Sequence, residues 1–269
     1  MGNTTGISWC DATWNVARGC SKVNNDCLYC YMMRDGDRYG YDGDVVKRTK
    51  TVFNMPLNYK ELKSKAHNGK PLIFTSSLTD VFHPQIDSFR NEVWDIIRKC
   101  PHLIFQVLTK RPERITDNLP KDWGNGWDNV WLGVSAGNQP NYNKMFSAFK
   151  NVKSKTKFLS LEPMNGEVLL RGTDNERNNW DEVFDWIIVG AESGFGTIAN
   201  DPKVKWRYRE CKLEWIENVV KECKSKDKPV FIKQLGNHLA KEMNLKDRTG
   251  SDINEFPNSL QLRQFPRAI

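Results

Sequence analysis

Seven short apolar runs, rich in β-branched and aromatic side chains, recur along the chain. Each run is apolar at nearly every position rather than at every second one, which is the pattern of a strand buried on both faces of a parallel sheet. The predicted strands are Trp14–Ala17, Leu72–Thr75, Leu103–Leu108, Val130–Val134, Lys157–Leu161, Trp186–Val189 and Val230–Ile232.

Amphipathic stretches separate these runs. Apolar residues recur at helical spacing in Ile86–Lys99 and in Cys211–Lys224. Strands that alternate with helices predict an α/β fold, a partial parallel (β/α) barrel of about six or seven strands spanning residues 1–240. The tail from Lys241 lacks periodicity, so residues 241–269 are predicted to form a C-terminal extension that packs on the barrel.

Length and composition narrow the class of protein. A chain of 269 residues can bury a substantial core in one large domain. No apolar run approaches the roughly 20 residues that span a bilayer, and Met1–Cys10 lacks the regions of a signal peptide. Seven cysteines, an odd number, fit a reducing compartment better than a disulfide framework. We therefore expect a cytoplasmic protein without a membrane partner, with Cys100, Cys211 and Cys223 in its core.

The charge pattern favours a polyanionic partner. The net charge of +7 gives a basic surface, which attracts phosphates without regard to sequence. Lys47, Arg48 and Lys50 cluster in one segment, and Lys203–Arg209 alternates cations with Trp206 and Tyr208. Such alternation can follow a nucleic-acid backbone and stack on bases. The alternative is a solvated helix start with Trp206 packed on the core. The polar stretch Asp174–Asp181 is predicted to be a surface excursion.

The cysteine motif at Cys20, Cys27 and Cys30, C-x6-C-x2-C, carries the most specific chemistry. A closed zinc site needs four ligands, and the four histidines are scattered, so Cys10 would have to supply the fourth. An iron–sulfur cubane held by three thiolates instead leaves one iron without a protein ligand, open to a substrate or cofactor. The two interpretations differ in what fills the fourth position.

Polar or ionisable residues follow every predicted strand. In parallel α/β barrels the carboxyl ends of the strands meet at one rim, where ligands bind. Single residues have ordinary alternatives: Ser77 and Asp80 could cap the helix near Ile86, and Glu162 could pair with Lys110 or Lys233. Together they predict a site. The segments at strand ends are Arg18–Cys20, Thr75–Asp80, Thr109–Pro112, Gly133–Ser135, Ser160–Pro163, Gly190–Gly194 and Lys233–Gly236.

Several of these segments, in order, carry a resemblance. The sequence resembles the phage-associated three-Cys-motif family, which is similar to the radical SAM superfamily and to spore photoproduct lyase. The match runs from Ile7 to about Pro257. The segments that carry it are the cysteine motif, Phe74–Asp80, Val107–Pro112, Leu159–Pro163, Ile188–Gly194 and Phe231–Gln234.

The resemblance implies a partial barrel of the radical SAM type. It implies a [4Fe–4S] cluster on Cys20, Cys27 and Cys30, with S-adenosylmethionine (SAM) on the fourth iron. Reductive cleavage of SAM would give a 5′-deoxyadenosyl radical, which abstracts hydrogen from a substrate. The superfamily's usual spacing is C-x3-C-x2-C, whereas six residues separate the first two cysteines in this chain.

The resemblance also implies roles for residues at the rim. Tyr31 matches the aromatic residue near adenine, and Ser76, Ser77 and Asp80 lie where the second-strand motif meets the methionine amino group. Ser135 and Glu162 would face ribose or carboxylate. The remaining assignments follow strand order: Lys110 or Arg111 at the SAM carboxylate, Glu192 and Ser193 at adenine or substrate, Lys233 and Gln234 on the substrate side, with Lys110, Glu192 and Lys233 as catalytic candidates.

These expectations combine into one leading function and one alternative. The leading function is a radical SAM enzyme that modifies, rearranges or repairs a nucleic-acid base or nucleotide, with phage DNA hypermodification as one case. It would take electrons from a donor such as flavodoxin or ferredoxin, in the host cytoplasm if a phage encodes it. The alternative is a non-catalytic zinc or iron–sulfur module that binds nucleic acid, with Cys10 as the fourth ligand.

Overall fold

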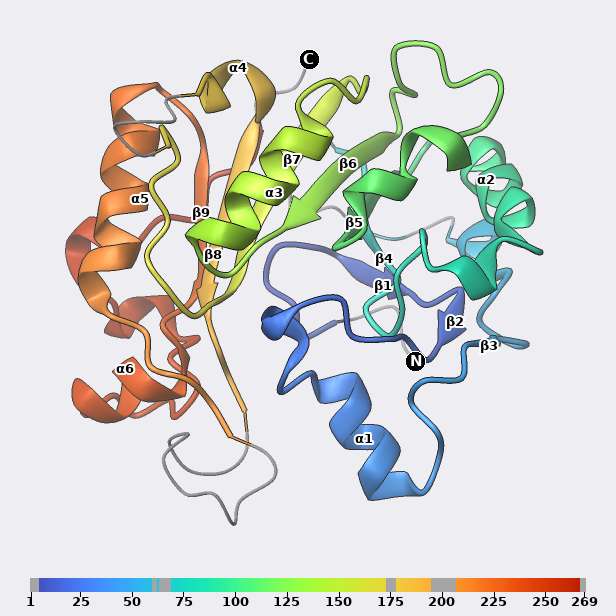
Figure 1. Cartoon of the computed structure of the whole chain (residues 1–269). Helices are drawn as coiled ribbons and strands as arrows, with labels where there is room; N and C mark the ends of the chain where they lie inside the picture. Colours follow the sequence, from blue (N-terminus) through green and yellow to red (C-terminus); the bar gives the residue numbers. More distant parts are fainter. Residues whose placement is uncertain (1–4, 60–61, 63–68, 173–177, 195–206, 267–269) are drawn as a thin grey trace.

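A single curled parallel sheet organises the molecule. The computed structural model describes residues 5–59, 62, 69–172, 178–194 and 207–266. Seven strands of this part of the chain pair in the order β1-β4-β5-β6-β7-β8-β9 and form a half-barrel, as Figure 1 shows. This confirms the predicted partial parallel barrel. The strands are β1 (Ala12–Trp14), β4 (Leu72–Thr75), β5 (Ile104–Thr109), β6 (Val130–Ser135), β7 (Thr156–Met164), β8 (Trp186–Ala191) and β9 (Val230–Gln234).

The first predicted strand is wrong in its position. The run Trp14–Ala17 belongs to two elements, because β1 ends at Trp14 and β2 (Ala17–Arg18) pairs antiparallel with β3 (Lys47–Arg48). Asn15 is the cause. Its buried side-chain oxygen accepts hydrogen bonds from the Leu78 amide at 2.9 Å and from the Ser77 hydroxyl at 3.1 Å, so it caps the end of β4 instead of continuing β1.

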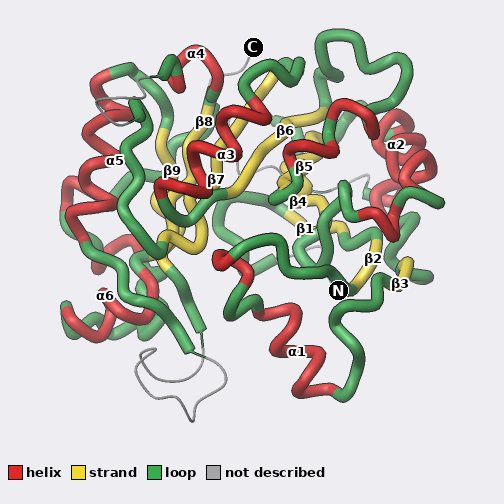
Figure 2. The backbone as a smooth tube through the Cα atoms, viewed as in Figure 1, coloured by secondary structure: helices red, strands yellow, loops and turns green. Residues whose placement is uncertain are grey.

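Helices lie against the outer side of the curved sheet, as the tube in Figure 2 shows for α2, α3 and α5. The helix predicted from Ile86 begins later, because Pro84–Ile86 forms a short 3-10 turn, η3, capped by the ring of His83. The alternative role of Ser77 and Asp80, as caps of the helix near Ile86, does not hold, because His83 caps this turn. The helices are α1 (Tyr31–Tyr39), α2 (Arg90–Lys99), α3 (Gln139–Phe149), α4 (Trp180–Val183), α5 (Leu213–Ser225) and α6 (Gly236–Glu242).

Strands β4 to β9 divide their apolar side chains between two clusters. Alternate residues of β6 illustrate this: Leu132 and Val134 pack with the helices, and Trp131 packs with the inner cluster. The inner cluster is a layer of rings, because Trp9, Phe158 and Trp186 contact one another with centroids 5.9–6.4 Å apart. This layer fills part of the half-barrel interior and leaves its carboxyl-end rim for a cavity.

The C-terminal extension runs back along the last strand. The Ile232 amide donates to the Leu262 carbonyl at 2.8 Å, and the Trp186 indole donates to the Gln264 carbonyl at the same distance. The Phe265 ring packs on Trp186 with centroids 5.5 Å apart, which adds it to the inner ring layer. The extension contains the 3-10 turns η6 (Ile253–Glu255) and η7 (Asn258–Leu260).

Some sequence predictions lie partly or wholly outside the described residues. These are Lys203, Lys205 and Trp206 of the basic and aromatic stretch, and the first half of the polar stretch, residues 174–177. In the rest of that polar stretch, Trp180 is buried and begins α4. Cys100, Cys211 and Cys223 are buried, as predicted. Across the described part of the chain, no helix has the length and apolar character to cross a membrane.

Candidate active site

A cavity of about 520 Å³ opens at the carboxyl ends of the strands. Its wall takes residues from the ends of β4 to β9 and from the loop that carries the cysteine motif, residues 20–30, called the Cys loop below. Two of the fifteen residues predicted for the site do not line the cavity: Arg111 donates to the Ser21 carbonyl, and Gln234 is buried and donates to the Ala191 carbonyl. The cavity brings together the other thirteen: Cys20, Cys27, Cys30, Tyr31, Ser76, Ser77, Asp80, Lys110, Ser135, Glu162, Glu192, Ser193 and Lys233.

The Cys loop begins at a glycine that the fold requires. Gly19 has φ of +106°, and a Cβ there would lie 2.2 Å from the Val45 carbonyl oxygen, so a side chain is excluded. The Cys20 amide then donates to the Gly43 carbonyl at 2.8 Å. Cys27 ends a 3-10 turn, η1 (Asn25–Cys27), and Cys30 directly precedes α1. Backbone contacts therefore hold all three cysteines.

The thiols line the cavity without converging on one point. Burial raises the pKa of Cys20 to about 12 and also raises the pKa of Cys30, so both are neutral thiols unless a cation binds them. Among the described residues, no three His, Cys, Asp or Glu side chains lie close enough together to hold a metal ion. Cys10 is buried in the inner ring layer, before β1 begins, so it does not join the other three.

Asp80 stabilises the backbone of the rim through hydrogen bonds. It is buried, and its carboxylate accepts hydrogen bonds from the Thr109 hydroxyl at 2.8 Å and from the amides of Phe82 and Lys110 at 2.9 and 3.0 Å. These bonds join the end of β4 to the end of β5. Asp80 therefore orients the backbone that carries Lys110.

Two lysines face each other across the ends of β5 to β9. The Lys110 ammonium donates to the Ser135 hydroxyl and to the Glu162 carbonyl. The Lys233 ammonium forms an ion pair with the Glu162 carboxylate. The alternative of an ion pair between Glu162 and a lysine thus holds for Lys233. Both members are about one-fifth exposed, so the pair faces the cavity rather than the core.

Glu192 is bound by a residue that the sequence did not single out for the site. The Arg209 guanidinium donates to both Glu192 carboxylate oxygens, at 2.9 and 2.7 Å, in a bidentate pair. Another guanidinium nitrogen donates to the Asn25 carbonyl at 2.7 Å, and the guanidinium lies 5.6 Å from the centre of the Tyr29 ring. Arg209 therefore joins the end of β8 to the Cys loop.

Four buried polar atoms in the cavity wall have no hydrogen-bond partner among the described residues: Trp9 Nε1, Ser76 Oγ, Thr79 Oγ1 and Ser160 Oγ. Buried polar groups almost always have partners, so such a cluster indicates the position of a polar ligand. Ser76 also has φ of +71°, a left-handed conformation that is uncommon for a residue other than glycine. Ser160 was detectable in sequence as the one polar residue in Phe158–Leu161, a buried strand.

Ser21, in the Cys loop, and His83 do not form a serine–histidine nucleophile. Ser21 Oγ lies 3.0 Å from His83 Nε2, but His83 Nδ1 accepts the Gln85 amide. In the neutral ring the proton is then on Nε2, which donates to Ser21 and cannot act as its base. Arg111 also donates to Ser21 Oγ, at 2.9 Å. The arrangement holds the start of the loop in place.

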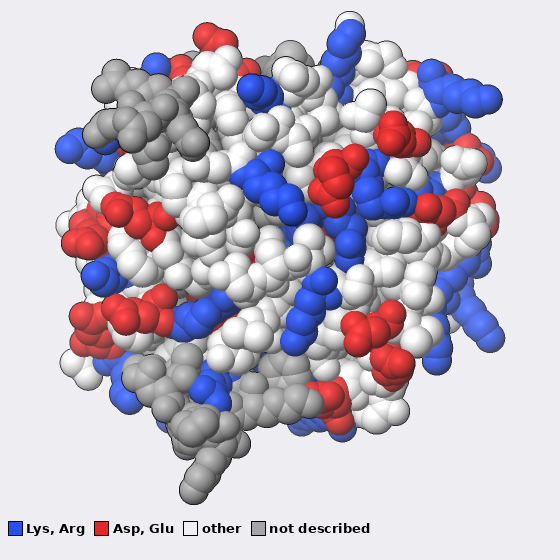
Figure 3. All heavy atoms as spheres, in the orientation of Figure 1, with Lys and Arg blue, Asp and Glu red and all other residues white. Residues whose placement is uncertain are grey.

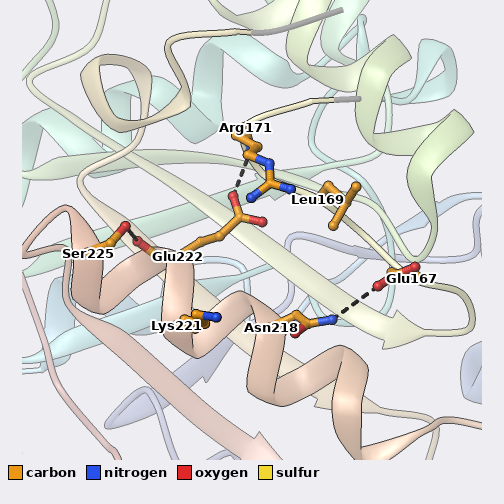
Figure 4. A pocket seen from close by; sticks show the side chains of 7 residues that line it. All are labelled: Glu167, Leu169, Arg171, Asn218, Lys221, Glu222 and Ser225. Atoms are coloured by element: carbon orange, nitrogen blue, oxygen red, sulfur yellow. Dashed lines mark hydrogen bonds between the residues drawn. The ribbon is translucent and has the colours of Figure 1, made fainter. Parts of the chain in front are cut away.

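A second cavity of about 520 Å³ lies between α5 and the segment after β7, and Figure 4 shows its wall. Both of its carboxylates accept hydrogen bonds from neighbours in its wall: the Arg171 amide donates to Glu222 at 2.8 Å, and Asn218 donates to Glu167 at 3.1 Å. None of the residues predicted for the site lines it. The rim cavity is therefore the candidate active site.

Comparison with known proteins gives one family. The model of the family described as "Protein of unknown function (DUF5131)" matches residues 4–257. No curated protein and no solved structure matches the chain. The match covers the half-barrel, the Cys loop and most of the C-terminal extension.

Proposed function

We propose that this chain, which belongs to the DUF5131 family, is a radical SAM enzyme that acts on a nucleic-acid base or nucleotide. The observation that carries the proposal is the cavity itself. Three thiols share its wall with two lysines and with four buried polar atoms that have no partner among the residues the structure describes. The thiols suit an iron–sulfur cluster and the polar groups suit a zwitterionic, hydroxylated ligand.

The donor set fits the cluster better than it fits a single metal ion. The three thiolates of a cubane bind three different iron atoms, so their sulfur atoms need not converge on one point. Cys20, Cys27 and Cys30 would hold the cluster and leave one iron free. A reduced cluster with SAM would supply a 5′-deoxyadenosyl radical for hydrogen abstraction. The zinc alternative needs Cys10, which lies in the inner ring layer.

The remaining wall matches the chemical groups of SAM. SAM has one carboxylate, one amino group and two ribose hydroxyls. Lys110 and Lys233 are the cations that can neutralise the carboxylate, and Glu162 lies between them as an acceptor for the amino group. Ser76, Ser135 and Ser160 offer hydroxyls to ribose. Tyr31 is exposed at the cavity, and its hydroxyl donates to the Ser77 carbonyl, which keeps the ring at the mouth.

The floor of the cavity keeps water away from the reacting atoms. Trp9, Phe74 and Leu108 line it, and Trp9 and Phe74 pack with ring centroids 4.6 Å apart. A radical requires such an environment, because water competes for reactive intermediates. A base within a duplex would have to leave the stack to reach this depth. Lys110, Glu192 and Lys233 are the ionisable groups that would face it. Electrons would come from a flavodoxin or a ferredoxin.

The test is reductive cleavage of SAM by anaerobically reconstituted protein. We expect brown protein with about four irons per chain that forms 5′-deoxyadenosine with dithionite, and loss of both properties in Cys30→Ala. Cys100→Ala is the control, because Cys100 is buried away from the cavity. Colourless wild-type protein with stoichiometric zinc would refute the proposal.

A further inference from the structure

The Cys loop contains one buried residue, and it is neither a cysteine nor apolar. Asp26 is 3% exposed, whereas every other residue from Cys20 to Cys30 is at least partly exposed. Its carboxylate accepts four hydrogen bonds, from the Gly137 amide at 2.9 Å and from the side-chain amides of Asn138, Asn141 and Asn165 at 3.2, 2.8 and 2.7 Å. An ionised carboxylate offers about four acceptor positions, so Asp26 is fully used.

The four donors are held in place by bonds of their own. Asn138 caps α3, because its side-chain oxygen accepts the Asn141 amide at 3.1 Å. The Asn165 amide donates to the Gly137 carbonyl at 2.7 Å, which joins the end of β7 to the start of α3. A Cβ on Gly137 would lie 2.6 Å from Asp26 Oδ1 and 2.3 Å from Asn165 Nδ2. The receptor for Asp26 is therefore built into the fold.

The position of Asp26 explains the unusual cysteine spacing. The Cys loop follows Gly19, whose amide donates to the Leu78 carbonyl after β4, and Asp26 anchors the loop after β6 and β7, which lie two and three strands further along the sheet. Three residues fewer, as in C-x3-C, would shorten the reach of the loop by up to roughly 10 Å. Arg209 provides a second tether through the Asn25 carbonyl. The six-residue spacing lets the loop cross the mouth of the cavity.

We propose that Asp26 is a positioning residue that anchors the Cys loop across the cavity and thereby fixes Cys27. Cys27 follows Asp26 directly, and the Cys30 amide donates to the Cys27 carbonyl at 3.3 Å. Fixing Asp26 therefore also restrains the position of Cys30. The hydrogen bonds to Asp26 are present without a cluster. That they position Cys27 to hold a cluster rests on the proposed function.

The first measurement uses the apoprotein and needs no cluster. Asp26→Asn puts a donor against the amide donors and removes the charge. Because hydrogen bonds to a charged group are strong, we expect Cys27 and Cys30 to react with N-ethylmaleimide about tenfold faster, as mapped by mass spectrometry. The reaction rate of Cys20 should change little, because its amide is bound to the Gly43 carbonyl and not to the Asp26 anchor. Asp185→Asn is the control, because Asp185 accepts the Lys157 amide at the opposite end of the strands.

The second measurement uses the reconstituted protein. We expect Asp26→Asn to bind less iron and to lose one iron more readily in air, seen as a three-iron signal in electron paramagnetic resonance. If Asp26→Asn does not fold, Asn165→Ala removes one of the four donors and is expected to give the same effects more weakly.

The outcomes separate the two proposals. Thiol reactivity and iron content like those of wild type in Asp26→Asn would overturn the positioning role. Faster Cys27 labelling in a protein whose wild type binds no cluster would support the anchor and refute the radical SAM function.

Discussion

At the residue scale, some polar side chains of the site are hydrogen-bonded to other residues of the chain, and others are not. Asp80 and Glu192 are fully engaged with their own chain, while Ser76 and Ser160 have buried hydroxyls without partners among the described residues. An unmade hydrogen bond in a buried site destabilises the fold. The unpaired hydroxyls are therefore the positions where ligand binding gains most from each bond.

We predict that Ser160→Ala lowers affinity for SAM without lowering stability. The Ser160 hydroxyl has no partner to lose in the part of the chain that the structure describes, so the free energy of unfolding stays the same or rises by up to about 1 kcal/mol. The dissociation constant for SAM, measured by calorimetry on reconstituted protein, rises about fivefold to tenfold. Ser154→Ala is the control, since that hydroxyl donates to the Thr156 carbonyl at the other end of β7. A destabilised variant with unchanged affinity would contradict this role.

Sequence predicted the residues that meet at the rim, because strand ends in a parallel sheet converge whatever the loops do. It missed Asp26 and Arg209. Asp26 bonds to residues 111 to 139 positions away, and Arg209 to Asn25 over 184 positions. No local pattern marks such a pairing, since an aspartate in a loop and an arginine in a basic stretch are ordinary in isolation.

At the element scale, burial on both faces made the strands easy to predict. Six of the seven predicted runs coincide with strands of the sheet within a few residues, because packing against helices on one side and rings on the other leaves no polar face. The first run failed where one polar residue, Asn15, diverts the chain. Its polarity is visible in sequence, but its partner Leu78 is not.

Lys157, at the start of β7, gives a pH-dependent prediction. Its ammonium is buried and donates to the Phe149 and Lys150 carbonyls at the end of α3. Burial lowers the pKa of Lys157 from 10.5 to about 8. Between those values the unfolded chain binds the extra proton, so the free energy of unfolding rises with pH across this window.

The Lys157 prediction is checked against Lys157→Met. The unfolding free energy of wild type minus that of the variant should increase by up to about 3 kcal/mol from pH 8 to pH 10.5, measured by urea titration. Lys155→Met serves as the control, because Lys155 is an exposed partner of Asp128. A difference that stays constant with pH would show that Lys157 keeps an ordinary pKa.

At the scale of the whole molecule, two segments outside the sheet cover the half-barrel, one near the N-terminus of the chain and one at its C-terminus. The Cys loop crosses the mouth of the cavity, and the C-terminal extension adds Phe265 to the inner ring layer. Sequence predicted an extension that packs on the barrel. Its path along β9 depends on backbone bonds such as Ile232 to Leu262, which any side chain permits and which periodicity therefore cannot reveal.

The net charge of +7 also leads to a test of whether the protein binds nucleic acid. Figure 3 shows Lys and Arg side chains gathered across the middle of one face, among scattered Asp and Glu. If the substrate is a nucleic acid, cations near the rim should matter more than cations at the opposite end. Lys47 and Lys50 are exposed beside the segment that contacts Gly19 and Cys20, whereas Lys224 and Lys226 lie at the end of α5.

We predict tight binding of single- or double-stranded DNA at low salt, falling steeply as salt rises. Each phosphate contact contributes about −0.9 to the logarithmic salt slope for a duplex and about −0.7 for a single strand. Lys47→Gln with Lys50→Gln should lower affinity and flatten the slope by one to two such contacts, as measured by fluorescence anisotropy. Lys224→Gln with Lys226→Gln removes the same charge and should change the slope little. Equal effects of the two double substitutions would mean that binding depends on net charge alone and not on cations near the rim. Absence of binding at low salt would exclude a nucleic-acid polymer and leave a free nucleotide as the substrate.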